Sequence, residues 1–385
     1  MNNNVVFLAS SQDYPYKFTA QNTKTELMAS GLILCADTIT IVNTTKGSKD
    51  FKKVNHGNKG GIKHISFPFR LNGFFSIFLN SFNFIKVLRY CRKDKMNNTA
   101  IIGHDYLLVY LFMVISARFL GYKIVLVVNE WRMYLSDLNR FQKIDYYLYH
   151  KISGHFVDGI FPISSYLETK TSIFKKPSLK VPVLADFERI KPIVDFEKSN
   201  YFLYCANAGY FRIIELLIES LGLLAKEGYL TTFKFVLHGT KAELDKVNEY
   251  INGKNLSKSI VILTKIPYDQ LLQEYQKALA LLIPLDDGMQ DVARFPQKIA
   301  EYCSTGGPII TGAVGEIPLY FKADINAFIS NDLSAKGYAA QMKKVLENPD
   351  EAIKVGLKGR LLGESKFNYV SVGQEMHEFL NSLFE

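Results

Sequence analysis

Cationic, acidic and backbone groups suited to holding an anion come together in the segment that begins at Arg294. It reads Arg-Phe-Pro-Gln-Lys-Ile-Ala-Glu. The loop through Phe295 and Pro296 leads into an expected helix, so free backbone N–H groups and the positive end of the helix dipole favour an anion there. Lys298 and Glu301 share one face of that helix and either address one ligand together or form an ordinary surface ion pair. An ammonium group suits a phosphate, and a carboxylate suits ribose hydroxyls.

Alternating strands and helices position this segment. β-branched runs predict strands in the first half of the chain at 5–9, 38–43, 100–103, 123–129 and 159–163, and periodicity predicts helices at 23–36, 74–92, 106–120 and 143–152. The second half predicts strands at 201–206, 233–238, 259–263, 279–284 and 308–311, with helices at 213–227, 241–251, 268–278, 298–304 and 370–384. Repeated strand–helix alternation indicates an α/β protein with parallel sheets covered by helices on both faces.

The chain is long enough for two such domains. It has 385 residues, and a domain usually takes roughly 100–200. The alternation breaks at about 180–200, where Pro182 and Pro192 stand among charged residues. We therefore expect a Rossmann-like domain over 1–190, a second over 191–368, and a final helix over 369–385 that packs back toward the first domain. Ligands of such folds bind outside the carboxyl ends of the strands.

Charge is distributed unevenly between the two halves. Residues 1–195 hold 26 Lys and Arg against 14 Asp and Glu, which leaves 20 against 23 for the remainder. A basic half attracts polyanions or an anionic membrane. Because no nucleic-acid-binding motif accompanies the charge, we expect no nucleic-acid partner.

The location we expect is the cytoplasm. The first residues lack the basic head and long apolar run of a signal peptide. The most apolar stretch, 106–119, is interrupted by Arg118 and too short to span a bilayer. The four cysteines are widely spaced among apolar neighbours, which predicts buried thiols rather than disulfides or a metal cluster. They are Cys35, Cys91, Cys205 and Cys303.

The segment from Arg294 resembles the donor-site signature of retaining GT-B glycosyltransferases of family four, "FP.K..EY...G.PVI", which is followed by the pair Gly315-Glu316. The resemblance implies two Rossmann-like domains facing across a cleft, with a nucleotide-sugar donor, UDP-linked by preference, held by the C-terminal half. It also implies sugar transfer with retention to a glycan or lipid-linked acceptor in cell-surface polysaccharide synthesis. Lys298 would hold the donor diphosphate, helped by backbone N–H groups near Phe295, and Glu301 would bind the ribose.

A second match follows the first strand of the C-terminal half. Family members place an Arg there and a Lys five residues later, and both reach the diphosphate; in this chain Asn207 and Arg212 stand at those positions. Gly209 lies between them. Arg212 would serve as the second phosphate-binding cation, because a guanidinium binds phosphate oxygens bidentately, or it is a solvated arginine at a helix start. The loop at Lys265 and Ile266 resembles the loop whose backbone meets the nucleobase.

The chain also departs from the family pattern. Many members carry a sugar-contacting Glu that seven residues separate from the position of Glu301, and here that first position is Ala293. Three nearby carboxylates, Asp286, Asp287 and Asp291, either compensate or belong to a turn.

On the acceptor side, relatives show a His-Glu pair where this chain has Asn129-Glu130. His104-Asp105 is the best remaining polar pair for binding the acceptor, unless Asp105 only caps a helix. Loop lysines at positions 17 and 24 either face phosphate or are solvated.

The chemistry expected is metal-independent and needs no cofactor, because no Asp-x-Asp motif follows a strand and no His/Cys cluster has ligand spacing. Arg212, Lys298 and Glu301 form the expected catalytic set. Two other interpretations stay open. One is a sugar-nucleotide epimerase, which needs further acid–base residues in the cleft, and the other is a catalytically silent homologue that acts as a scaffold. Donor hydrolysis or transfer by the pure protein would separate the last from an enzyme.

A basic, aromatic surface in the N-terminal half predicts peripheral contact with the inner face of an anionic membrane. The expected helix 74–92 and its C-terminal flank carry an aromatic stripe and a cationic end, formed by Phe74, Phe78, Phe82, Ile85, Lys86, Arg89, Arg92 and Lys93. The expected loop 46–63 adds six lysines. This composition suits an interfacial helix, although an aromatic stripe also suits packing on a sheet.

Overall fold

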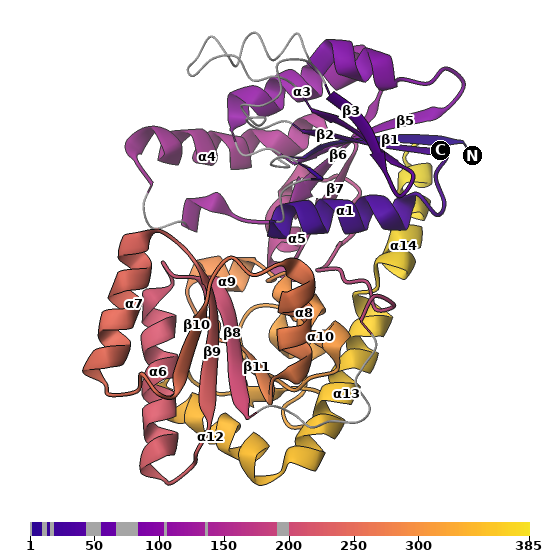
Figure 1. Ribbon diagram of the computed structural model, residues 1–385. Helices are drawn as coiled ribbons and strands as arrows, with labels where there is room; N and C mark the ends of the chain where they lie inside the picture. The colour runs from indigo at the N-terminus through magenta and orange to yellow at the C-terminus, as the bar shows by residue number, and fades with distance from the viewer. Residues whose placement is uncertain are drawn as a thin grey trace. The chain divides into compact units, whose positions relative to one another are not determined.

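The computed structural model describes residues 2–9, 14–15, 19–43, 55–66, 84–103, 106–134, 138–190 and 200–385. The chain forms two compact units (Figure 1). Unit 1 comprises Met1–Leu184, Ala293–Gln297 and Phe367–Glu385, and unit 2 comprises Ala185–Val292 and Lys298–Lys366. The boundaries drawn from the sequence lie near two of these divisions, but the sequence did not indicate that Ala293–Gln297 belongs with the first unit.

Unit 1 is built on a seven-stranded sheet in the order β3-β4-β2-β1-β5-β6-β7. Its strands are β1 (Asn3–Ala9), β2 (Thr38–Asn43), β3 (Asn55–Lys59), β4 (Ile62–Ser66), β5 (Asn97–Gly103), β6 (Lys123–Val128) and β7 (Gly159–Pro162). Its helices include α1 (Ala20–Leu32), α3 (Leu107–Phe119), α4 (Arg140–Ile152), α5 (Ser165–Thr171) and α14 (Tyr369–Ser382), with 3₁₀ turns η1 (Arg132–Tyr134), η2 (Ser153–Phe156) and η3 (Ser172–Phe174). Residues 84–91 are also helical.

Unit 2 is built on a six-stranded parallel sheet in the order β10-β9-β8-β11-β12-β13. Its strands are β8 (Tyr201–Asn207), β9 (Thr232–His238), β10 (Ile260–Leu263), β11 (Ala280–Ile283), β12 (Ile309–Gly312) and β13 (Phe328–Ser330). Its helices are α6 (Phe211–Lys226), α7 (Lys241–Gly253), α8 (Tyr268–Lys277), α9 (Met289–Ala293), α10 (Lys298–Thr305), α11 (Ile317–Tyr320), α12 (Ala335–Glu347) and α13 (Pro349–Lys366). Helices α6 and α7 lie on one side of this sheet and α8 and α10 on the other (Figure 1).

Both units are doubly wound α/β layers, so the predicted fold class is confirmed. The apolar strands explain the layering: β6 and β11 consist mostly of Ile, Val and Leu, and nearly all of these residues are buried. In unit 2, rings of Phe202, Phe233 and Phe235 pack edge to face in the core.

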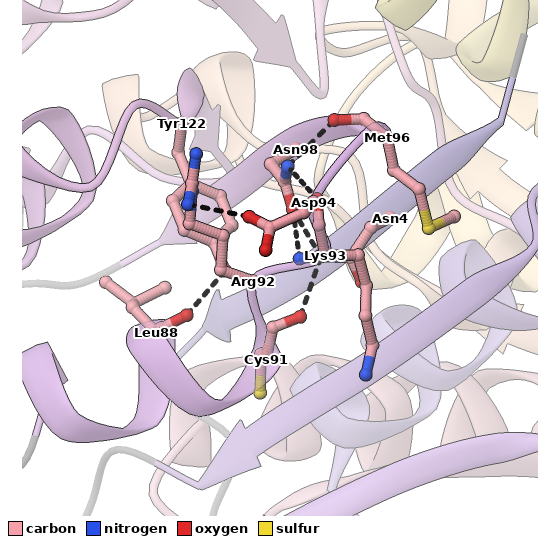
Figure 2. A network of polar contacts seen from close by, with 9 residues as sticks. All are labelled: Asn4, Leu88, Cys91, Arg92, Lys93, Asp94, Met96, Asn98 and Tyr122. Atoms are coloured by element: carbon pink, nitrogen blue, oxygen red, sulfur yellow. Dashed lines mark hydrogen bonds and ion pairs between the residues drawn. The ribbon is translucent and has the colours of Figure 1, made fainter.

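A buried amide network fixes the amino-terminal ends of β1 and β5 (Figure 2). The Asn98 side chain donates to the carbonyls of Lys93 and Met96, each at 2.8 Å, and its Oδ1 accepts from the side chain of Asn4 at 2.7 Å. Asn4 also donates to the carbonyl of Cys91 at the end of helix 84–91. Because each buried amide is satisfied, the network specifies the register of the two strands at low cost.

One expectation for unit 1 is wrong. Part of the expected basic loop, 46–63, is the hairpin of β3 and β4, which pair antiparallel at the edge of the sheet. Gly60 and Gly61 form its two-residue turn with φ of 60° and 84°, backbone angles that other residues rarely adopt. The aromatic positions 74, 78 and 82 of the expected membrane helix lie outside the described residues, so that surface stays a prediction.

Helix α14 packs against α1 in unit 1 through direct backbone contact. A Cβ atom at Gly31 would lie 2.1 Å from the carbonyl oxygen of Tyr369, and one at Gly373 would lie 2.4 Å from backbone atoms of Gly31. The two helices can approach this closely only because both positions are glycine. The last residues of the chain are thereby fixed to the first helix.

The cysteine prediction is corrected at one position. Cys91, Cys205 and Cys303 are buried, but Cys35 is exposed, because it lies in the turn after α1 rather than under a helix. Among the described residues, no helix is both long and apolar enough to cross a membrane, and no three His, Cys, Asp or Glu side chains gather as metal ligands would.

Candidate functional site

The topology of unit 2 selects one edge of its sheet as a ligand site. β8 lies between β9 and β11, so the chain leaves β8 in one direction along the sheet and β11 in the other. At such a switch point the loops after the two strands part and leave a crevice outside their carboxyl ends. Asn207 ends β8, and Asp286 lies in the loop after β11.

Asn207 and Gly209 shape the loop after β8. The Asn207 side-chain oxygen accepts from the backbone N–H of Gly209 at 2.7 Å, which closes a tight turn. A Cβ at Gly209 would sit 3.0 Å from that same oxygen, so the turn fits glycine best. The Asn207 side chain therefore stabilises the turn that follows it, and α6 begins directly after this turn.

Arg212 is the second residue of α6 and faces the other loop of the crevice. Its guanidinium pairs with Asp286 at 3.1 Å, while the arginine side chain stays 77% exposed. An exposed pair of this kind contributes little to stability, so a doubly charged ligand can displace Asp286 at small cost. The sequence suggested Arg212 as an anion-binding residue, and it did not reveal this carboxylate partner.

The carboxylates 286–291 form a turn. Asp291 accepts from the backbone N–H of Asp286 at 2.8 Å, and Asp286 accepts from the N–H of Gly288. Gly315, after β12, has a φ of 57° and lies against the backbone carbonyls of Asp291 and Val292. The glycine thus lets the loop after β12 pack against α9.

Lys298 and Glu301 come together at the start of α10. Burial raises the pKa of the Glu301 carboxyl, and the charge of Lys298 acts in the opposite direction. Burial, helped by Lys298, also lowers the pKa of His238 at the end of β9. Among the described residues, none forms an ion pair with the Lys298 ammonium. A cation that forms no ion pair, beside a helix N-terminus, is suited to an anionic ligand.

Tyr268 is a neighbour of Glu301 that the sequence did not single out. Burial, and next the charge of Glu301, raise the pKa of its phenol well above the usual range. Arg189 lies over its ring at 5.1 Å. Tyr268 starts α8 directly after the loop of Lys265 and Ile266, where Lys265 adopts a left-handed φ of 54°. The Ile-Pro-Tyr sequence there was the available signal.

Arg294, Phe295 and Pro296 belong to unit 1 by compactness. Phe295 is buried and its ring contacts Phe367 edge to face at 5.5 Å. The amide of Gln297 donates to the carbonyl of Leu184. The side chains of Phe295 and Gln297 therefore anchor the segment that precedes α10, and the helix itself begins at Lys298.

On the acceptor side, unit 1 places Asn129 directly after β6, where its side-chain oxygen accepts from Lys24 at 2.9 Å. Lys24 also donates to the carbonyl of Val181 at 3.3 Å. The expectation that Lys24 is a loop lysine is wrong: it lies in α1 and is only 5% exposed. Burial lowers the pKa of Lys24 to about 7. Glu130 is exposed, and His104 and Asp105 lie outside the described residues.

Trp131 and His150 continue this edge of unit 1. Their rings stack at 3.9 Å with an angle of 12° between the planes. Burial lowers the pKa of His150 to about 4, and the charge of Arg132 acts in the same direction. His150 is therefore neutral at physiological pH, which lets it stack on the indole ring without desolvating a charge.

Two doubly wound Rossmann-like units in one chain are the architecture of the GT-B glycosyltransferases. Sucrose-phosphate synthase from Thermosynechococcus elongatus has this fold, with a TM-score of 0.79, 14% identity and 99% of both chains covered. HepE from Anabaena, in complex with UDP and glucose, has a TM-score of 0.74 at 12% identity, and the match covers 99% of this chain and 100% of HepE. Trehalose-6-phosphate synthase OtsA has a TM-score of 0.74 at 10% identity, and the match covers 98% of this chain and 99% of OtsA. At such identities the likeness establishes the fold.

The family follows from the sequence of unit 2. Residues 186–361 match the glycosyl transferases group 1 family. This match confirms the resemblance seen from Arg294 to Glu316 and identifies the chain as a glycosyltransferase. Among curated proteins, no sequence matches the chain.

Proposed function

We propose that the chain transfers a sugar from a UDP-sugar, with retention, to a glycan or lipid-linked acceptor in cell-surface polysaccharide synthesis. The observation that carries the proposal is the grouping of Lys298 with Glu301 at the start of α10, beside the carboxyl ends of β8 and β9. A cation that forms no ion pair and a partly buried carboxylate one helical turn apart fit the phosphate and ribose of a nucleotide.

Each residue of this set has a distinct role in the proposal. Lys298 and the first N–H groups of α10 hold the diphosphate. Arg212 leaves Asp286 and binds the same group, which keeps the positive charge that stabilises the leaving nucleotide. Glu301 accepts from ribose hydroxyls, and Lys265 and Ile266 present backbone groups to the base.

The choice of uridine rests on neighbours of the same fold. HepE from Anabaena is described in complex with UDP and glucose and with UDP-glucose. The two proteins share 12% of their residues, so the likeness supports a nucleotide sugar and leaves the base to experiment.

The reaction proposed needs no side chain as nucleophile. The bond between the anomeric carbon and the β-phosphate oxygen breaks, and the acceptor oxygen forms the new glycosidic bond on the same face. The acceptor proton passes to the departing phosphate. The protein's part is to hold both substrates and to stabilise the charge that builds on the diphosphate.

The acceptor is proposed to bind unit 1 at the carboxyl ends of β5 and β6. Lysine ammonium groups only donate, so Lys24 turns the oxygen of Asn129 toward itself. The amide nitrogen of Asn129 is then directed away from Lys24 and can donate to an acceptor oxygen. Glu130 is the exposed carboxylate next to it.

The test is a melting-temperature screen with UDP, GDP and CDP and their sugars, repeated with EDTA. A ligand of the folded state raises the midpoint, and we expect UDP to do so with and without EDTA. No shift with any nucleotide at millimolar concentration would refute the donor site. UDP binding without donor hydrolysis or transfer would favour the scaffold, and interconversion of sugar epimers would favour the epimerase.

A further inference from the structure

Helix α3 is apolar on two opposite faces, which is unusual for a helix on the surface of a soluble domain. Its sequence, Leu-Leu-Val-Tyr-Leu-Phe-Met-Val-Ile-Ser-Ala-Arg-Phe, contains only Ser116 and Arg118 as polar residues. One face packs inward through Tyr110, Met113 and Ala117, all fully buried. An amphipathic surface helix should present polar residues on the opposite face, and α3 does not.

The exposed side of α3 forms one continuous stripe. Leu108, Ile115 and Phe119 follow helical spacing and stay exposed, with Phe119 at 82%. Exposed apolar groups also concentrate on the adjacent helix α4, at Phe141, which is 85% exposed, and at Ile144. Among the described residues, nine of the 22 exposed large hydrophobic side chains fall between positions 106 and 156. Exposed apolar side chains gathered on neighbouring helices are typical of interaction surfaces.

Helices α3 and α4 pack against each other (Figure 1). Tyr110 and Tyr149 pack edge to face at 5.2 Å. The backbone N–H of Leu107 donates to Asp145 at 3.3 Å, and the Tyr110 hydroxyl donates to the carbonyl of Ser153. We call the exposed apolar side chains of the two helices the α3–α4 face; it comprises Leu108, Ile115, Phe119, Phe141, Ile144 and Tyr147.

The exposed charges of helices α3 and α4 that form no ion pair with a described residue are all positive. Arg140, Lys143 and Lys151 are exposed on α4, and none of them forms an ion pair with a described residue. Lys151 lies over the Tyr147 ring at 5.2 Å. Asp145 is the only acidic residue of the two helices, and it is occupied by the N–H at the start of α3. Aromatic and aliphatic side chains bordered by unpaired cations match the boundary between the headgroups and acyl chains of an anionic bilayer.

We propose that the α3–α4 face docks on an anionic lipid bilayer. A second copy of the chain fits less well, because a symmetric contact would bring the three cations of one copy against the same three of the other. The proposal deepens the proposed function: it rests on that function for its purpose, which is to bring unit 1 to a lipid-linked acceptor. The docking itself requires neither donor nor catalysis.

The test is co-sedimentation of the full chain with phosphatidylglycerol vesicles and with phosphatidylcholine vesicles, at low and at high salt. We expect binding to phosphatidylglycerol that weakens with salt, because exposed charges are screened. The double variant Phe119→Ser/Phe141→Ser and the double variant Arg140→Glu/Lys143→Glu should each lower the partition coefficient by at least about tenfold. All four positions are exposed, so the fold should persist.

Matched controls lie in unit 2, where Leu230 is 89% exposed and Lys258 is exposed. Leu230→Ser and Lys258→Glu should bind vesicles as the wild type does. Equal binding by wild type and face variants would overturn the proposal, as would an absence of wild-type binding to phosphatidylglycerol at low salt. A change from dimer to monomer in the Phe119→Ser/Phe141→Ser variant, without a change in lipid binding, would overturn it too. The UDP melting shift is measured separately, so a failure of the donor site is told apart from a failure of docking.

Discussion

The buried ammonium of Lys24 should make the stability of unit 1 depend on pH in a way that one substitution removes. Lys24 is 5% exposed, and none of the described residues forms an ion pair with it. Its burial lowers the pKa from 10.5 to about 7. Because a tenfold change in proton affinity corresponds to about 1.4 kcal/mol, the charged form costs the fold roughly 5 kcal/mol relative to a solvated lysine.

The direction in which pH changes the free energy of unfolding follows from proton linkage. The unfolded chain, with the higher pKa, binds the proton more strongly, so between the two pKa values the free energy of unfolding rises with pH. The penalty is fully present below about pH 7 and is relieved as the pH rises toward 10.5. Between pH 6 and pH 9 the wild type should therefore gain roughly 2.7 kcal/mol from this residue.

Lys24→Met keeps most of the side-chain volume and removes the charge. It also removes the hydrogen bonds to Asn129 and Val181, but a neutral amine keeps two N–H donors, so their loss adds a nearly constant term at all pH values. The difference in free energy of unfolding between the variant and the wild type should thus shift by roughly 2.7 kcal/mol in favour of the wild type from pH 6 to pH 9.

Urea unfolding followed by tryptophan fluorescence provides the assay. Trp131 is the only tryptophan of the chain and lies in unit 1, so its emission reports the unit that contains Lys24. Lys86→Met, at an exposed position of the same unit, is the control and should track the wild type. Parallel pH dependences of the wild type and Lys24→Met would refute the reasoning, because Lys24 would then titrate as it does in the unfolded chain.

Three further predictions concern the donor site and the helix contact of unit 1. Arg212→Ala and Lys298→Ala should each lower kcat/KM by about tenfold to 150-fold without changing the melting temperature, because a charged hydrogen bond contributes about 1.5–3 kcal/mol. Lys258→Ala, at an exposed position of the same unit, is the control. Wild-type turnover in both variants would contradict the proposed donor site. Glu301→Gln should weaken UDP binding in calorimetry and leave the unfolding midpoint unchanged. Gly31→Ala should lower the free energy of unfolding of unit 1 by about 3 kcal/mol in urea, because the added methyl group would lie 2.1 Å from a backbone carbonyl oxygen. A decrease below about 0.5 kcal/mol would show that α14 can move away from α1.

The strands could be predicted because their signal is local. β2 begins and ends at the predicted residues, Thr38 and Asn43, since a run of Ile, Val and Thr leaves little choice of structure. The hairpin of β3 and β4 was missed because its lysines and polar residues indicate a solvated loop. The Gly60-Gly61 turn was the available signal.

Helix α13 was missed for a different reason. It contains Gly356, Gly359 and Gly363, and glycine lowers helix propensity by about 1 kcal/mol per residue. The structure gives the compensation: a Cβ at Gly356 would lie 2.5 Å from the carbonyl oxygen of Gly306, and one at Gly359 would lie 2.7 Å from that of Asn326. The glycines permit close packing, and no local pattern in the sequence encodes the surface they pack against.

The candidate site likewise has features that are local in the sequence and features that depend on long-range contacts. The spacing of Lys298 and Glu301 along one helix is a local property, and the structure does bring the two together. The pairing of Arg212 with Asp286 joins residues 74 positions apart, and the burial of Lys24 depends on which face of α1 the sheet and its loops cover. Contacts of that kind need the three-dimensional arrangement.

Two features that do not favour a stable, soluble fold, a buried ammonium group and exposed aromatic side chains, occur together in unit 1. A sequence shaped by stability alone would replace the buried ammonium of Lys24 with an apolar side chain and the exposed Phe119 and Phe141 with polar ones. Either change would stabilise unit 1 or make it more soluble. The buried ammonium costs unit 1 free energy and the exposed phenylalanines cost it solubility, which favours a requirement other than folding for both. A polar contact presented through Asn129 and a surface for lipid are two such requirements, and a transferase whose acceptor is carried on a membrane needs both on the unit that binds the acceptor.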